Sequence, residues 1–129
     1  MRSVPAVLIV LSLLAGCGGD DEPKLYTLEP TRACLTDEGV RVSDNESDFV
    51  ASTALGGSLR AQFPSDNVVV LSFGESLEDA ARTEDAYRRF APNRVALKDV
   101  LGRFRNVTMI WAFSPSQEDL KTVSDCLKA

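Results

Sequence analysis

The sequence predicts an α+β domain, with a mainly antiparallel sheet of about four strands and helices packed on one face in a small two-layer sandwich. Two observations support this prediction. Residues 58–73 and residues 100–113 each contain two short apolar runs separated by turn residues, which is the pattern of a β-hairpin. Each pair of runs is followed by an amphipathic stretch that starts with a helix-capping residue. Paired strands followed by a helix are typical of an antiparallel sheet with helices on it.

The first part of the domain is expected to contain a short helix and a short strand. Pro30 suits the first turn of a helix and Gly39 suits its end, so residues 31–38 are predicted to be helical. Residues 40–42 then form a short strand.

Residues 45–55 allow two interpretations. Asn45 and Asp48 resemble a helix cap before an alanine- and serine-rich run, which favours a short helix. Gly56-Gly57 between two runs is also a hairpin signal. We favour the helix.

The second part of the domain contains the two predicted hairpins, each followed by a helix. Polar and apolar residues alternate from Ser58 to Phe63, the period of a half-buried strand. Ser114-Pro115-Ser116-Gln117 is interpreted as a capping box, with proline at the first helical position. The predicted elements are strands over 58–63, 68–73, 100–104 and 107–113, a helix over 75–91, and a last helix through Cys126.

The two strand-turn-strand-helix stretches resemble each other. Asn67-Val68 opens a strand that leads to Ser76–Asp79, and Asn106-Val107 opens one that leads to Ser116–Asp119. A duplicated unit explains this similarity. Capped helices after strands also look alike without any duplication.

The N-terminus has the features of an export signal. Met1-Arg2 supplies a positive charge, and Val4–Ala15 is almost wholly apolar. A helix of that length covers about 18 Å, too short for a hydrocarbon core of about 30 Å, so it has the size of a signal-peptide core. Leu14-Ala15-Gly16-Cys17 resembles the lipobox of bacterial lipoprotein precursors. The resemblance implies cleavage before Cys17, a diacylglyceryl group on its thiol and an acylated N-terminus.

This resemblance divides the chain into residues 1–16 as signal peptide, 17–24 as lipidated cysteine and flexible tether, and 25–129 as one domain. It implies a protein held by lipid at the cell membrane, on the extracytoplasmic side. Stable anchoring needs two or more acyl chains, which this modification supplies. Two alternatives are an ordinary cleaved secretory signal with a free thiol at Cys17, and a buried helix.

Two cysteines remain, Cys34 and Cys126. In an oxidising compartment two cysteines predict one disulfide. A metal pair or a catalytic thiol are the alternatives, and neither has a histidine to act with, because the chain contains none.

Composition argues against several classes of function. The net charge of −5 becomes one unit more negative when Arg2 leaves with the signal, which argues against nucleic-acid binding. Without histidine a serine or cysteine nucleophile lacks its usual base. Asp44, Glu46 and Asp48 alternate like calcium ligands but lack the glycine and glutamate of an EF-hand loop. We expect no enzyme, no cofactor and no metal site.

One segment is strongly basic in this acidic chain. It predicts either a patch for an anionic partner (a cell-wall polymer, lipid headgroups or an acidic protein) or a solvated face balanced by nearby acids. Its basic residues are Arg88, Arg89, Arg94, Lys98, Arg103 and Arg105.

The functional hypothesis is therefore a non-enzymatic lipoprotein domain that binds or scaffolds an envelope protein, polymer or small ligand. The alternatives are a small envelope hydrolase or transferase without histidine chemistry, and an inhibitor or assembly factor for another envelope protein.

Overall fold

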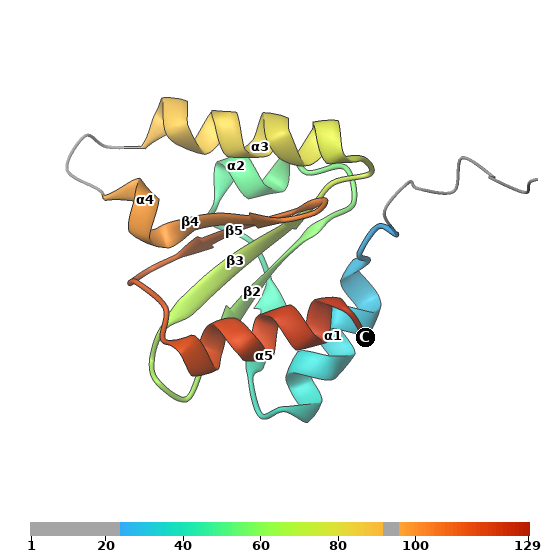
Figure 1. The fold of residues 1–129 in the computed structure, drawn as a ribbon, viewed down its shortest axis with the longest axis vertical. Helices are drawn as coiled ribbons and strands as arrows, with labels where there is room; N and C mark the ends of the chain where they lie inside the picture. The colour runs from blue at the N-terminus through green and yellow to red at the C-terminus, as the bar shows by residue number, and fades with distance from the viewer. Residues whose placement is uncertain (1–23, 92–95) are drawn as a thin grey trace, which may run out of the picture.

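Five antiparallel strands form the centre of the fold, and helices cover both faces of the sheet (Figure 1). The structure is a computed structural model that describes residues 24–91 and 96–129. The strand order is β1-β2-β3-β5-β4. The strands are β1 (Arg41–Asp44), β2 (Ser58–Gln62), β3 (Val68–Phe73), β4 (Leu101–Phe104) and β5 (Val107–Trp111). The helices are α1 (Leu28–Asp37), α2 (Phe49–Ser52), α3 (Leu77–Phe90), α4 (Leu97–Val100) and α5 (Gln117–Leu127).

The main hydrophobic core lies between the sheet and the pair α1 and α5. Successive strand residues point to opposite faces, and on β3 the buried residues Val69, Leu71 and Phe73 all point to this side. They pack in one cluster with Val123 and Leu127 of α5. A disulfide joins α1 to α5 on this side of the sheet.

The helices α2 and α3 cover the opposite face. Thr108 of β5 has the other parity and is fully buried, and its hydroxyl donates a hydrogen bond to the Ala80 carbonyl of α3 at 3.1 Å. Tyr87, also on α3, donates to the Asp48 carboxylate at the start of α2 at 2.8 Å. The buried residues of α3 are therefore mostly polar, and hydrogen bonds contribute to its docking.

The α+β class and the antiparallel sheet are confirmed, whereas two details of the prediction are corrected. The sheet has five strands rather than about four, because β1 pairs with β2, with Arg41 opposite Gln62. The helices lie on both faces rather than one, which gives three layers. The physical reason is that Val70 and Ile110 face each other on the second side of the central strands, and an apolar face must be covered.

Residues 45–55 contain the short helix that was favoured, and Asp48 caps it by accepting a hydrogen bond from the Ala51 N–H at 2.9 Å. Gly56 and Gly57 do not turn a hairpin. Instead, their backbones bond to Phe73 at the end of β3, with N···O distances of 2.7 and 2.8 Å.

The last helix begins later than predicted. Ser116, not Ser114, is its cap, and it accepts a hydrogen bond from the Asp119 N–H at 3.1 Å. Pro115 therefore precedes the helix. The cap matches the one on α3, where Ser76 accepts from the Asp79 N–H at 3.0 Å; in both, a serine sits three residues before an aspartate.

The repeated order of strand, strand and helix is present, but the two units are not superposable as wholes. At one end of the β3–β5 pair, Asn67 donates its side-chain amide to the Phe113 carbonyl at 3.0 Å. At the other end Asn106 donates to the Gly74 carbonyl at 2.8 Å. The hairpins thus match, whereas α3 and α5 lie on opposite faces of the sheet.

Candidate functional site

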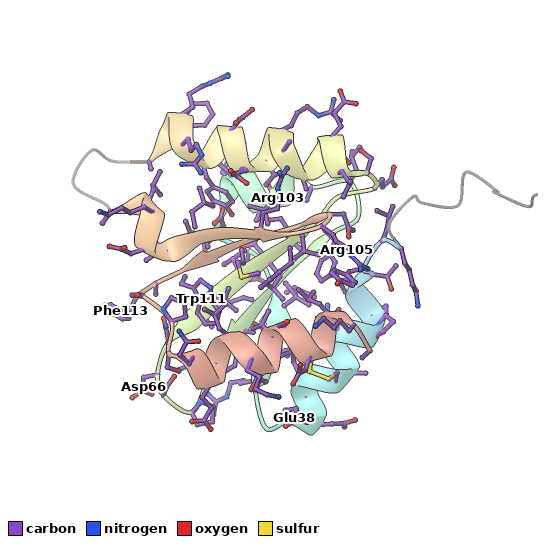
Figure 2. All side chains as sticks on the ribbon, in the orientation of Figure 1. Glu38, Asp66, Arg103, Arg105, Trp111 and Phe113 are labelled. Atoms are coloured by element: carbon purple, nitrogen blue, oxygen red, sulfur yellow. A yellow bond between two sulfur atoms is a disulfide. The ribbon has the colours of Figure 1, made fainter. Side chains whose placement is uncertain are left out.

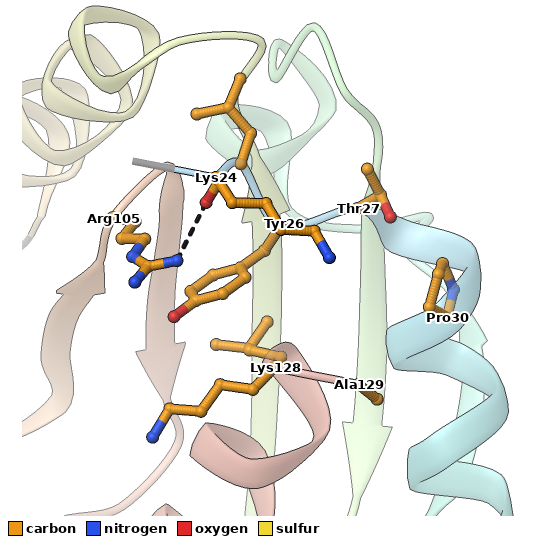
Figure 3. Close-up of a pocket in the computed structure, with 9 residues that line it drawn as sticks. Lys24, Tyr26, Thr27, Pro30, Arg105, Lys128 and Ala129 are labelled. Atoms are coloured by element: carbon orange, nitrogen blue, oxygen red, sulfur yellow. Dashed lines mark hydrogen bonds between the residues drawn. The ribbon is translucent and has the colours of Figure 1, made fainter. Parts of the chain in front are cut away.

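The segment that enters the domain, residues 24–27, lies beside the turn between β4 and β5 (Figure 3). Asn106, fully buried in that turn, holds the segment through its side-chain amide. Its oxygen accepts from the Tyr26 N–H at 2.8 Å, and its nitrogen donates to the Tyr26 carbonyl at 2.8 Å. The amide therefore pairs with both backbone groups of Tyr26, as a neighbouring strand does.

Arg105 occupies the same turn in an unusual backbone conformation. Its φ is +49°, in the left-handed region, where asparagine, aspartate and glycine are the favoured residues. Its guanidinium donates to the Lys24 carbonyl at 3.1 Å and lies 4.9 Å from the centroid of the Tyr26 ring. The side chain is thus held by one hydrogen bond and one cation–π contact.

Three basic side chains gather where the chain enters the domain. Lys24, Arg105 and Lys128 are exposed, and all three line a cavity of about 240 Å³ together with the half-buried Tyr26. No aspartate or glutamate is among the described residues that line it. We call Lys24, Tyr26, Arg105 and Lys128 the entry cluster. It is a concentration of positive charge on an acidic protein.

The predicted basic segment is divided by the fold. Arg88 and Arg103 both contact Glu84, at 3.0 and 3.4 Å. Arg105 instead lies in the turn after β4, beside the entering segment, as Figure 2 shows for Arg103 and Arg105. The shared acid favours the interpretation of a balanced, solvated face for the α3–β4 part.

Within residues 24–91 and 96–129, no ion pair involves Arg89 or Lys98. Arg94 lies outside the described residues. Of the six basic residues, the structure therefore groups Arg88 and Arg103 around Glu84 and places Arg105 beside the entering segment.

The predicted disulfide is present, with Cys34 of α1 bonded to Cys126 of α5 across 92 residues of sequence. Cys126 is almost fully buried in the main core. The predicted lipid attachment site, Cys17, lies outside the described residues.

The buried ionisable groups have structural partners. Hydrogen bonding from the Glu75 N–H and from Arg82 lowers the pKa of Asp79, against the opposing effect of burial. Burial, with Asp48 as hydrogen-bond acceptor, raises the pKa of Tyr87 far above its usual range. Asp79 therefore remains ionised and accepts from the segment just before α3, and Tyr87 remains a neutral donor.

The described part of the chain contains no group of three metal-ligating side chains. In the alternating acids of residues 44–48, Asp44 pairs with Arg32 at 2.9 Å, and Asp48 bonds to Ala51 and Tyr87. These contacts use the carboxylates within the fold.

Among the helices of residues 24–91 and 96–129, none has the length and apolar character needed to cross a membrane.

A comparison with protein-family models gave no match, and comparisons with curated proteins and with solved structures gave none either.

Arg105 was among the basic residues predicted from the sequence, whereas Lys24, Tyr26 and Lys128, which the fold brings to it, were not. A signal for Lys24 was present, because the last residue of the predicted tether lies next to the part of the domain that holds the entering chain. Lys128 had none, since a lysine near the end of a helix is also expected from the helix dipole alone.

Proposed function

We propose that this chain is a lipoprotein of the bacterial cell membrane, anchored through Cys17 on the extracytoplasmic side, whose domain binds or scaffolds an envelope component and catalyses no reaction. The observation that most supports an exported protein is the disulfide between Cys34 and Cys126. Disulfides persist in oxidising compartments and are rare in the cytosol. It agrees with the four-residue lipobox resemblance at Leu14–Cys17.

The non-enzymatic part of the proposal rests on the state of the polar groups. The Asp48 carboxylate accepts from the Ala51 N–H and the Tyr87 hydroxyl, and the Asp79 carboxylate accepts from the Glu75 N–H and from Arg82. These hydrogen bonds hold α2 and α3 in place. A general acid or base needs a side chain free to exchange a proton with a substrate.

The experiment is expression of the full chain in a bacterium, followed by membrane fractionation and intact mass measurement. Wild type should partition into detergent with a mass that shows cleavage before Cys17, added lipid and one disulfide. Cys17→Ser should remain uncleaved or become freely soluble. If wild type and Cys17→Ser partition identically with no lipid mass on either, the proposal is wrong.

A further inference from the structure

We propose that the entry cluster docks on the anionic phospholipid headgroups of the membrane that holds Cys17, and so fixes this end of the domain against the lipid surface. The inference rests on the proposed lipid anchor. It adds a second contact, from residues of the folded domain, and therefore an orientation.

The short chain between Cys17 and Lys24 limits the distance between the lipid anchor and the entry cluster. Seven residue steps separate Cys17 from Lys24, and a fully extended chain covers about 3.5 Å per residue, so Lys24 stays within about 25 Å of the anchor. Lys24 lies in the entry cluster, so the tether keeps the cluster near the membrane.

The entry cluster differs in charge from the chain as a whole. The chain as a whole is negative, so an anionic leaflet repels most of its surface. The entry cluster instead offers three exposed cations around a cavity in which the described lining residues include no acidic side chain. Ala129, where the sequence ends, also lines this cavity, and a terminal carboxylate there offsets one of the three charges. Each basic residue close to an anionic membrane strengthens binding about fivefold. Of the surfaces near the tether, this one is attracted to the lipid.

The backbone of Arg105 and its contact with the Tyr26 ring give the entry cluster a defined geometry. Arg105 keeps a left-handed backbone at φ +49°, in which an arginine is strained and a glycine is not. The tight turn between β4 and β5 favours this conformation, and it fixes the direction in which Arg105 leaves the backbone. The Arg105 guanidinium also lies against the Tyr26 ring, and tyrosine is enriched at the headgroup level of membranes, where an apolar ring with a polar tip fits. Figure 3 shows Arg105 and Lys128 on either side of Tyr26.

The experiment uses the lipidated full chain in vesicles and measures the rate at which an amine-reactive reagent modifies each lysine. The vesicles are phosphatidylcholine alone or phosphatidylcholine mixed with phosphatidylglycerol. Lys24 and Lys128 should react at least about threefold more slowly in the mixed vesicles, in keeping with the fivefold effect of one basic residue, and this protection should fall with added salt. Lys98, which is outside the cluster, is the internal control and should react equally in both. Equal rates for all three lysines would overturn the proposal.

A double variant separates lipid docking from simple proximity to the anchor. Arg105→Gln with Lys128→Gln should return the rate at Lys24 to its value in phosphatidylcholine, whereas the control Lys98→Gln should leave the protection unchanged. Persistent protection of Lys24 in the double variant would overturn the proposal. The urea midpoint of the double variant, measured alongside, shows that the domain is folded.

Two other occupants are outcomes of the same assay. If glycerol phosphate slows labelling in phosphatidylcholine vesicles as much as phosphatidylglycerol does, the cluster binds soluble anions and membrane docking is wrong. If Lys24 and Lys128 are protected in both vesicles until Asp20, Asp21 and Glu22 are changed to amides, the acidic tether is the occupant.

If the proposed lipid anchor is wrong, the intact mass of the wild-type chain shows it separately, because no lipid mass is added at Cys17. The Cys17→Ser chain is then titrated with phosphatidylglycerol vesicles. Protection of Lys24 and Lys128 that rises with lipid supports the cluster even so, and no protection at any lipid concentration rejects it.

Discussion

Removing the Asn106 amide tests how the entering segment is held. Asn106→Ala deletes three hydrogen bonds of 2.8 Å, two to Tyr26 and one to the Gly74 carbonyl. The bond to Gly74 is buried, so the loss leaves a buried acceptor without this donor, at about 1–3 kcal/mol. The Tyr26 groups are only partly buried and gain access to water, so each contributes the net value of about 0.5–1.5 kcal/mol. We therefore expect a loss of about 2–6 kcal/mol.

The assay is equilibrium urea denaturation followed by the fluorescence of Trp111, which is the sole tryptophan and is almost fully buried. Asn67→Ala is the matched control, because Asn67 makes the corresponding contacts with Phe113 at the other end of the sheet, at 3.0 and 3.1 Å. Both variants should lose stability, but only Asn106→Ala should raise the labelling rate of Lys24. A loss below about 1 kcal/mol for Asn106→Ala, less than one orphaned buried acceptor costs, would refute the reasoning.

Three further predictions concern stability. Replacing both Cys34 and Cys126 by alanine should cost about 4–5 kcal/mol from the entropy of a closed loop of 92 residues, and reduction of wild type should reproduce that loss in the same urea assay. The pKa of Asp79 is lowered in the folded state, so its ionised carboxylate adds to the free energy of unfolding above the unfolded pKa of 3.8. This contribution is lost as the pH falls through the lower folded pKa. Asp79→Asn should therefore make stability fall less steeply in acid. The pKa of Tyr87 is raised above 10.0 in the folded state, so the contribution of its neutral hydroxyl to the free energy of unfolding is lost as the pH rises above that value. Tyr87→Phe should therefore remove the part of the fall in stability at alkaline pH that Tyr87 causes. Near neutral pH it should cost about 1 kcal/mol, for the bond to Asp48.

Local elements were predictable where side-chain period and turn chemistry agree. The strand over 68–73 has the predicted bounds, because a clear turn precedes it and glycine follows it. The last helix was placed too early, because Ser114-Pro115 and Ser116 both satisfy local capping rules and only the contact of Ser116 with Asp119 decides between them.

The layering was not predictable from local pattern. A strand such as β3, apolar on both sides, needs cover on both, but periodicity does not say which helix covers which face. The mostly polar contact surface of α3, with Ala80 and Thr83, also resembles an ordinary solvent-facing helix in sequence.

The site was predictable only in part, because its residues are far apart in the sequence. The disulfide followed from counting, because Cys34 and Cys126 were the two cysteines left. The entry cluster joins residues 24, 105 and 128, which no sequence window contains. Its organising residue, Asn106, looks like simple turn chemistry, although its amide replaces a strand partner for Tyr26.

The most direct test of the account is the intact mass of the chain extracted from bacterial membranes without reducing agent. The account predicts a chain that begins at Cys17, carries added lipid, and gains two hydrogens on reduction as the bridge between Cys34 and Cys126 opens. A chain that still begins at Met1, or one that begins elsewhere with an unmodified Cys17, would contradict it.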